Sequence, residues 1–268
     1  MINLGKTDVL GVDVSAVDYD YSVNEVITRA KTNRPLSVTA LAVHGLVLGI
    51  NNQEFRRRLN GIDMVLPDGQ PVYWLLKFWK KKDLPSRVYG PEFMLRVIKA
   101  AEVQGIGVYL YGSTINVLDS LIRNLKRDFP GLKIAGSEPS RFRKISKQEQ
   151  QEIIERIKRS QAGIVFVGLG CPRQEYWVFE YSRYLNKPLI AVGAAFNYHA
   201  GLLKKPPAWL QNLGLEWLFR LFQEPKRLTV RYVLYNTEFL ILFIFNFFRL
   251  MEIKRVYPSG CEKEELYG

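Results

Sequence analysis

The chain has 268 residues, of which 47% are hydrophobic and 24% charged, and its formal net charge is +12. This composition excludes a disordered or collagen-like chain, and the length allows one large α/β domain or two small ones. Two cysteines, Cys171 and Cys261, are too few for a disulfide framework or a four-thiolate zinc site. The acid-rich start of the chain does not have the pattern of a signal peptide.

Short apolar runs bounded by Gly, Pro or Asp predict six buried strands, at Ser37–Val43, Met64–Leu66, Gly107–Leu110, Lys133–Ala135, Ile164–Val167 and Leu189–Val192. Amphipathic patterns with capping residues predict helices between them, at Val23–Lys31, Pro91–Gln104, Thr114–Phe129, Ser146–Ser160 and Arg173–Leu185. The alternation predicts an α/β fold, a Rossmann-like parallel sheet with helices on both faces. Ligands are then expected beyond the carboxyl ends of the strands.

Strand patterns disappear after Pro206, and a helical pattern runs from Lys226 into the apolar run Phe239–Phe245, where Asn246 interrupts it. The apolar run is shorter than the roughly 20 residues that span a bilayer. Aromatic residues beside lysine and arginine suit a helix lying in an anionic membrane surface, with a core helix or an oligomer contact as the alternative. We therefore expect a catalytic core over 1–203, a helical membrane-associating appendage over 204–256 and a loose polar tail over 257–268.

The excess of positive charge is typical of proteins that bind nucleic acid, anionic lipid or phosphorylated substrates. The basic runs Arg56–Arg58 and Lys80–Lys82 are interpreted as solvated helix faces, and without a nucleic-acid-binding motif we expect no nucleic acid partner. Asp18 and Asp20 have the spacing of a metal–diphosphate motif, but a position before a helix favours capping. We expect no metal and no cofactor.

The run from Leu66 to Pro71 places Asp68 at the carboxyl end of a predicted strand. An aspartate there can act as a general base toward a substrate hydroxyl. It can equally be the N-cap of the following helix, since Pro71 suits a first helical turn. The residues alone leave both roles open.

A second motif follows the strand Ile164–Val167, with Gly168 and Gly170 before a predicted helix. Glycines let a ligand approach the backbone closely, and a helix N-terminus attracts anions. Gln174 can donate and accept hydrogen bonds. Arg173 stands where the dinucleotide-binding fingerprint needs its third glycine, so a nicotinamide cofactor is disfavoured.

Three further positions are candidates for substrate binding. Gly112 and Ser113 lie between a strand and a helix, where they could contact phosphate or ribose or simply belong to a helix cap. Asn197 and His199 follow the last strand and could reach a ligand or be buried polar groups. Arg87 is a candidate clamp for substrate charge.

The order of the motifs is more specific than any one of them: Val38-Thr39 with His44, Leu66–Pro71, Arg87–Pro91, Tyr111–Ser113, Gly168–Glu175, Ala191–Phe196, Glu216–Leu221 and Glu224–Arg227. From about Leu10 to about Leu250 the chain resembles the WecG/TagA/CpsF family of bacterial glycosyltransferases. The resemblance implies inverting transfer of a sugar of the N-acetylmannosamine type, or a related sugar, from a UDP-sugar to a polyprenyl-diphosphate-linked sugar in surface polysaccharide or teichoic acid synthesis. It also implies a cytoplasmic protein held peripherally at the inner face of the cell membrane and acting without a metal.

The resemblance assigns roles to several residues. It makes Asp68 the base, places Thr39 and Gln174 in the site, and brings arginines of the C-terminal segment to the diphosphate, here Arg220, Arg227 and Arg231. Such guanidinium groups, with helix N-termini, could replace a divalent cation.

This chain departs from the family at Leu41, where many members have asparagine, and at Asn197, where many have aspartate. The donor sugar and the acceptor sugar are therefore left open. The sequence also leaves open whether the protein forms a homo-oligomer. Two alternatives remain at this point: a Rossmann enzyme that uses NAD or modifies a sugar nucleotide, and a non-catalytic peripheral membrane protein.

Overall fold

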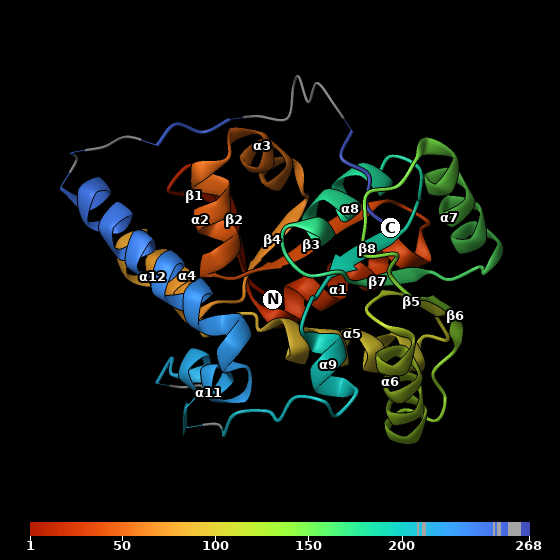
Figure 1. Ribbon diagram of the computed structural model, residues 1–268. Helices are drawn as coiled ribbons and strands as arrows, with labels where there is room; N and C mark the ends of the chain where they lie inside the picture. The colour runs from red at the N-terminus through yellow and green to blue at the C-terminus, as the bar shows by residue number, and fades with distance from the viewer. Residues whose placement is uncertain (208, 211–212, 249, 251–252, 257–263) are drawn as a thin grey trace.

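The computed structural model describes residues 1–207, 209–210, 213–248, 250, 253–256 and 264–268, without the side chains of Arg227 and Arg231. A six-stranded parallel sheet forms its centre (Figure 1), in the order β4-β3-β8-β7-β5-β6. The strands are β3 (Leu36–Leu41), β4 (Met64–Pro67), β5 (Val108–Gly112), β6 (Ile134–Glu138), β7 (Ile164–Gly168) and β8 (Pro188–Ala191). All six predicted strands are confirmed, with ends shifted by at most three residues.

Helices cover both faces of the sheet, as predicted (Figure 1). One core contains residues of α2 (Val43–Asn51), α3 (Gln53–Gly61), α7 (Lys147–Arg159) and α8 (Arg173–Tyr181). The other contains residues of α1 (Tyr19–Lys31), α5 (Gly90–Val103), α6 (Ile115–Asp128) and α9 (Ala195–His199). Strand side chains alternate between the two cores: Val165 and Val167 of β7 lie in the first, and Ile164 and Phe166 in the second.

Capping side chains set the starts of several helices. The Asp18 carboxylate accepts a hydrogen bond from the Tyr21 N–H at 2.8 Å, so α1 begins at Tyr19, before the predicted start at Val23. Asp18 therefore has the capping role that was expected of this motif. Ser146 and Glu149 form the predicted capping box of α7.

A two-stranded hairpin precedes the sheet and was not identified from the sequence. Strands β1 (Asn3–Val9) and β2 (Val12–Val17) pair antiparallel around Leu10 and Gly11, both with positive φ. Leu-Gly is a weaker turn signal than Asn-Gly or Asp-Gly, and β2 contains Asp13 and Ser15 although all six of its residues are buried. The Val65 N–H donates to the Ser15 hydroxyl at 3.0 Å, which ties the hairpin to β4.

The basic run in α3 is not a solvated face, because Arg58 is fully buried. Its Nε donates to a carboxylate oxygen of Glu180 at 3.0 Å, Glu54 accepts from its Nη1, and its guanidinium lies over the ring of Tyr176. The prediction was therefore wrong for Arg58, which bridges α3 and α8. Lys81 and Lys82, in contrast, are solvent-accessible, as expected, but the run Lys80–Lys82 follows a helical turn that ends at Trp79 and is not a helix face.

Arg58→Ala is expected to lower the free energy of unfolding by about 3–5 kcal/mol, because it removes the buried cation of Glu180 and leaves this carboxylate with the exposed and more distant Arg183, at 3.6 Å. Urea denaturation followed by circular dichroism measures this. Arg57→Ala is the matched control: Arg57 is partly exposed and pairs with Glu54 at 3.5 Å, so a loss of about 0–1 kcal/mol is expected. Equal losses for the two variants would contradict the assignment.

The end of the chain returns to the core, so the expected loose tail is wrong for residues 264–268. Leu266 is buried, its carbonyl accepts from the Ile145 N–H at 3.1 Å, and the Tyr267 ring packs against Tyr176. The remaining tail residues, 257–263, lie outside the described part of the chain.

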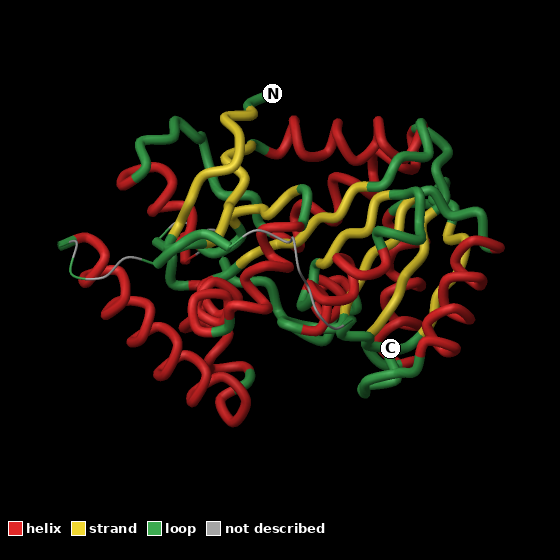
Figure 2. The backbone as a smooth tube through the Cα atoms, turned by 90° about the horizontal axis from the view of Figure 1, so that it is seen from above, coloured by secondary structure: helices red, strands yellow, loops and turns green. Residues whose placement is uncertain are grey.

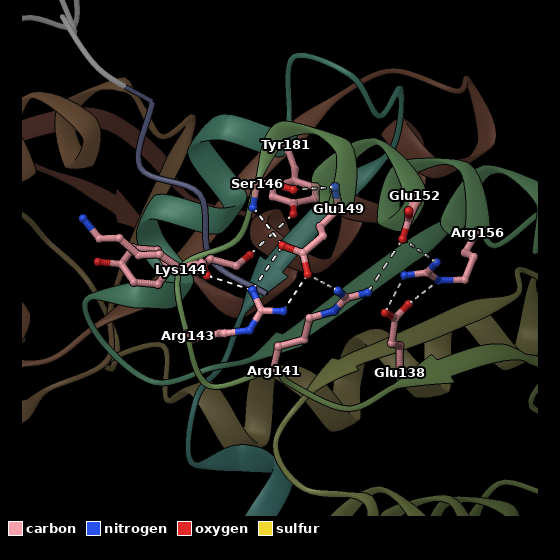
Figure 3. Close-up of polar contacts among 10 residues, drawn as sticks. Glu138, Arg141, Arg143, Lys144, Ser146, Glu149, Glu152, Arg156 and Tyr181 are labelled. Carbon is pink, nitrogen blue, oxygen red and sulfur yellow. Dashed lines mark hydrogen bonds and ion pairs between the residues drawn. The ribbon is translucent and has the colours of Figure 1, made fainter.

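Polar contacts surround the start of α7 beside this returning end (Figure 3). Glu149 accepts from Arg143 at 2.6 Å and also pairs with Arg141, while Arg156 pairs with Glu138 at 2.8 Å. Hydrogen bonding from Arg143 lowers the pKa of Glu149 to about 2. The carboxylate therefore stays ionised well into the acid range, which keeps the cap of α7 intact there.

The appendage contains α11 (Glu216–Gln223) and α12 (Pro225–Phe247), which lie beyond the β4 edge of the sheet (Figures 1 and 2). Near them are α4 (Gln70–Trp74) and the π-helical turn η1 (Leu75–Trp79). Asn246 does not interrupt α12. Among the described residues, one helical segment, Leu228–Phe247, is long and apolar enough to cross a bilayer, with a mean hydropathy of 1.4. The apolar run Phe239–Phe245 is thus part of a longer helical segment than the run by itself indicates.

One side of α12 packs along the core. Tyr235 meets the His44 ring edge-to-face at 4.5 Å between centroids, and Phe243 meets Trp79 in the same way at 5.6 Å. The Asn51 side-chain amide donates to Glu238 at 2.7 Å. The opposite side exposes a row of large apolar side chains, here called the outer face of α12: Val230, Val233, Leu234, Ile241, Ile244, Phe245 and Phe247, continued by Phe248.

Candidate active site

A cavity opens at the carboxyl end of the sheet, where β5 leads to β6 on one side and β7 leads to β8 on the other. Its volume is about 300 Å³. Gly112 and Gly168 are paired in register beside it, and a Cβ on Gly112, whose φ is +111°, would lie 2.8 Å from the Gly168 carbonyl carbon. Glycine is therefore required at Gly112 for the two strands to end side by side.

Asp68 follows β4 directly and lines this cavity. Its carboxylate accepts a hydrogen bond at 2.6 Å from the backbone N–H of Gly90, which is the first residue of α5. The N-cap residue of the adjacent helix α4 is Gly69, without a side-chain cap. Asp68 thus does not cap the helix that follows it, and its carboxyl group is left facing the cavity.

Charges of both signs surround Asp68. The Arg87 guanidinium donates to the Asp68 carbonyl at 3.0 Å and to the Glu216 carboxylate of α11 at 2.6 Å. Burial raises the pKa of the Asp68 carboxyl group, Arg87 opposes this, and the negative charge of Glu216 raises it further. A carboxyl group with a raised pKa is a stronger proton acceptor than an exposed aspartate.

Three side chains form a buried chain of hydrogen bonds at the start of α8. Both the Thr39 hydroxyl and the Gln174 amide donate to the same Glu175 oxygen at 2.9 Å, and Gln174 accepts from the Gly170 N–H at 3.1 Å. Burial raises the pKa of Glu175. Gln174 and Glu175 line the cavity, whereas Thr39 is fully buried and reaches the site only through Glu175.

The structure brings most of the predicted substrate-binding residues to this cavity. Its lining includes Ser113, Gly168, Gly170, Gln174, Asn197 and Arg220. Gly112 shapes its edge, and Arg87 lines an adjoining cavity that also includes Asp68 and Arg220. Arg227 and Arg231 belong to α12, but their side chains lie outside the described residues.

His199 does not line the cavity. Its Nε2 lies 2.9 Å from the Pro91 carbonyl, and burial lowers the pKa of the imidazole. Of the two roles that the sequence left open, His199 has that of a buried polar group.

Sequence reasoning missed Glu216, Glu175, Tyr89 and Tyr198 as lining residues. Glu175 and Glu216 belong to motifs quoted for the resemblance, yet nothing in their spacing shows that they meet Thr39 and Arg87. Among the described residues, no three His, Cys, Asp or Glu side chains are grouped so as to hold a metal ion. The arrangement combines a proton acceptor with two arginines, which suits transfer of a group from an anionic carrier.

Comparisons with known proteins agree with this chemistry. Residues 7–252 match the family described as "Glycosyl transferase WecG/TagA/CpsF family". Three relatives carry the name N-acetylglucosaminyldiphosphoundecaprenol N-acetyl-beta-D-mannosaminyltransferase. The protein of Bacillus spizizenii strain W23 is 32% identical over 66% of this chain and 67% of its own length. That of Bacillus subtilis strain 168 is 27% identical over 66% and 68%. That of Staphylococcus aureus strain MW2 is 26% identical over 84% and 88%. The chain therefore belongs to the WecG/TagA/CpsF family and is a glycosyltransferase.

Proposed function

We propose that this glycosyltransferase moves an N-acetylmannosamine-type sugar from a UDP-sugar to an N-acetylglucosamine carried on a polyprenyl diphosphate, with inversion at the anomeric carbon. The observation that carries the proposal is the Asp68 carboxyl group, which faces the cavity beside Arg87 and Arg220. The names of the relatives support the sugar and the acceptor. Family membership also favours a transferase over the nicotinamide-dependent and non-catalytic alternatives.

In the proposed reaction, the acceptor hydroxyl oxygen forms a bond to the anomeric carbon while the bond to the UDP oxygen breaks. Asp68 takes the hydroxyl proton. The pair of electrons leaves with the diphosphate of UDP, whose growing charge is stabilised by Arg220. Arg227 and Arg231 are further candidates for this role. One displacement from the face opposite the leaving group inverts the anomeric configuration.

Glu216→Ala is expected to move the acid limb of the pH–rate profile to lower pH. Glu216 raises the pKa of Asp68, so its removal lowers the pH below which the base becomes protonated. Measuring kcat/KM between about pH 4 and 8 tests this. Glu224→Ala is the control, because Glu224 is also on the appendage and pairs with Arg220, at 3.6 Å, rather than with Arg87. An acid limb that stays in place in Glu216→Ala would contradict the coupling.

The same proposal places the protein at the inner face of the cell membrane, attached through the outer face of α12. Moving exposed aromatic and branched side chains from water into the lipid headgroup region lowers the free energy. A net charge of +12 favours binding to membranes that contain anionic lipids. Because α12 packs lengthwise on the core through Tyr235 and Phe243, we propose that it lies in the membrane surface.

A donor and acceptor assay tests the proposed function. UDP-N-acetylmannosamine should raise the melting temperature of the protein, because it binds the folded state, whereas NAD should not. Adding N-acetylglucosaminyl-diphosphoryl polyprenol should release UDP, and NMR of the product should show an anomeric configuration opposite to that of the donor. Failure of every UDP-sugar to shift the melting temperature or to release UDP would refute the proposal.

A further inference from the structure

A second cavity of about 480 Å³ lies beside the first, between the core and the appendage. Residues of α2, α4, α11 and α12 line it. Ala42, Asp68, Glu216 and Arg220 line both cavities, so the two share a wall that contains the proposed catalytic base. The volume is within the usual range of about 300–1,000 Å³ for small-molecule sites.

The lining of this second cavity changes from charged to apolar. The charged residues that line it are the shared Asp68, Glu216 and Arg220, together with Arg87. Most of the remaining wall is aromatic or aliphatic, including Val43, Trp74, Trp217, Tyr235, Phe239 and Leu240. Arg87 and Arg220 can bind an anionic group and the apolar wall can bind an apolar chain, so a ligand that carries both fits this cavity.

Several apolar side chains of this wall are also open to solvent. Trp74 is 40% exposed, Trp217 41% and Leu240 55%. Exposed apolar residues around an apolar cavity are typical of ligand-binding grooves. Leu240 is followed directly by Ile241 of the outer face, so the cavity wall is continuous with the surface proposed to enter the membrane.

We infer that this cavity binds the first isoprene units of the polyprenyl chain of the acceptor, with the acceptor diphosphate at Arg87. The inference rests on the proposed function and adds a site to it. An isoprenoid diphosphate has the required order of parts, an anion next to a branched apolar chain. It would enter from the membrane along α12 and bring its sugar hydroxyl to Asp68 through the shared wall.

Binding measurements with two soluble acceptors test the inference without requiring turnover. One probe is N-acetylglucosaminyl-diphosphoryl farnesol and the other is the same diphosphate sugar with a methyl group in place of farnesyl. Isothermal titration below the micelle concentration, without vesicles, should show at least about tenfold tighter binding of the farnesyl probe, from burial of its apolar surface.

Two variants of the cavity wall, Leu240→Ser and Trp74→Ala, should each weaken binding of the farnesyl probe by about tenfold and leave the methyl probe unchanged. Ile241→Ser is the matched control, because it makes a comparable apolar-to-polar change one residue along α12, at a side chain that does not line the cavity. Its affinity for both probes should equal that of the wild type. Circular dichroism melting confirms that each variant is folded.

Equal affinity of the wild-type protein for the two probes would overturn the inference, as would equal losses in Leu240→Ser and Ile241→Ser. A short-chain phosphatidylglycerol that displaces the farnesyl probe with the same sensitivity to the variants would also overturn it, because the cavity would then bind membrane lipid in general. Selective farnesyl binding without sugar transfer would refute the proposed function and leave the isoprenoid site standing. Sugar transfer to both probes, bound with equal affinity, would refute the isoprenoid site and leave the proposed function standing.

Discussion

Asp68→Asn is expected to lower turnover by about 10²–10⁴-fold while the protein stays folded. Asparagine has nearly the same shape and can still accept the hydrogen bond from the Gly90 N–H, but it cannot take a proton from the acceptor hydroxyl. The measurement is kcat for sugar transfer at saturating donor and acceptor. Near wild-type turnover in a folded Asp68→Asn protein would remove Asp68 from the role of base.

Asp63→Asn is the matched control for this experiment. Asp63 precedes the same strand, β4, at its opposite end, where its carboxylate accepts from the N–H and the hydroxyl of Ser37, each at 2.8 Å. A similar loss of turnover in both variants would mean that disturbance of β4, rather than loss of the base, is responsible.

The raised pKa of Asp68 has a consequence for stability as well as for rate. Because burial favours the protonated form in the folded state, the ionised carboxylate destabilises the fold above the folded-state pKa, and this cost is relieved as the pH falls through it. Asp68→Asn removes the cost at neutral pH. The variant should therefore melt at the same temperature as the wild type or higher, while turnover of the wild type falls toward acid pH.

Replacing four residues at the far end of the outer face, Ile241, Ile244, Phe245 and Phe248, by serine is expected to abolish vesicle binding. Each is 41–66% exposed and would contribute roughly 1 kcal/mol on entering the membrane surface, so their loss weakens binding by roughly several hundredfold. Co-sedimentation with vesicles containing phosphatidylglycerol measures this. Donor binding should be retained, because none of the four lines either cavity.

Val103→Ser with Ile115→Ser is the control for this substitution. Both side chains are exposed, at the end of α5 and the start of α6, away from the appendage, so vesicle binding should not change. Undiminished vesicle binding by the fourfold variant would refute attachment through α12. Binding that does not depend on the content of anionic lipid would count against the electrostatic part of the proposal.

Point substitutions test the membrane proposal more cleanly than truncation does. Deleting the chain after Gly201 would also remove Arg255, which pairs with Asp13 at 2.8 Å, and Leu266, which is buried in the core. Such a truncation would lower the stability of the domain as well as membrane binding, so its loss of activity would have two causes.

Local patterns predicted the sheet and five of the helices that cover it, α1, α5, α6, α7 and α8, but not α2, α3 and α9. Five of the six strands contain short apolar runs, β6 (Ile134–Glu138) being the exception, and helices carry caps such as Ser146 and Glu149 that act within one turn. The position of Asp68 at the cavity followed from the same reasoning, because every parallel strand presents its carboxyl end to one edge of the sheet. The hairpin β1–β2 was missed because its turn lacks Asn or Asp and its buried strand contains polar residues.

Contacts between distant segments could not be predicted in this way. The sequence around Arg58 indicates a surface residue, because its buried partner Glu180 is on α8, 122 residues further along the chain. Glu216 meets Arg87 across 129 residues, and the returning tail reaches Ile145. The helix predicted from Lys226 into Phe239–Phe245 was confirmed as α12, although the helix continues through Asn246, a residue of low helix propensity.

The order of residues along the chain was thus sufficient for the α/β class, the sheet edge that carries the site and the glycosyltransferase family, since these depend on periodicity, caps and motifs that act over a few residues. Only the tertiary structure decided which side chains surround Asp68, that Thr39 contacts the cavity lining through Glu175, and that the appendage encloses an apolar cavity next to Asp68. The reason is physical: burial, charge pairing and cavity shape arise from segments that meet only after the chain has folded, and no local pattern encodes their distances.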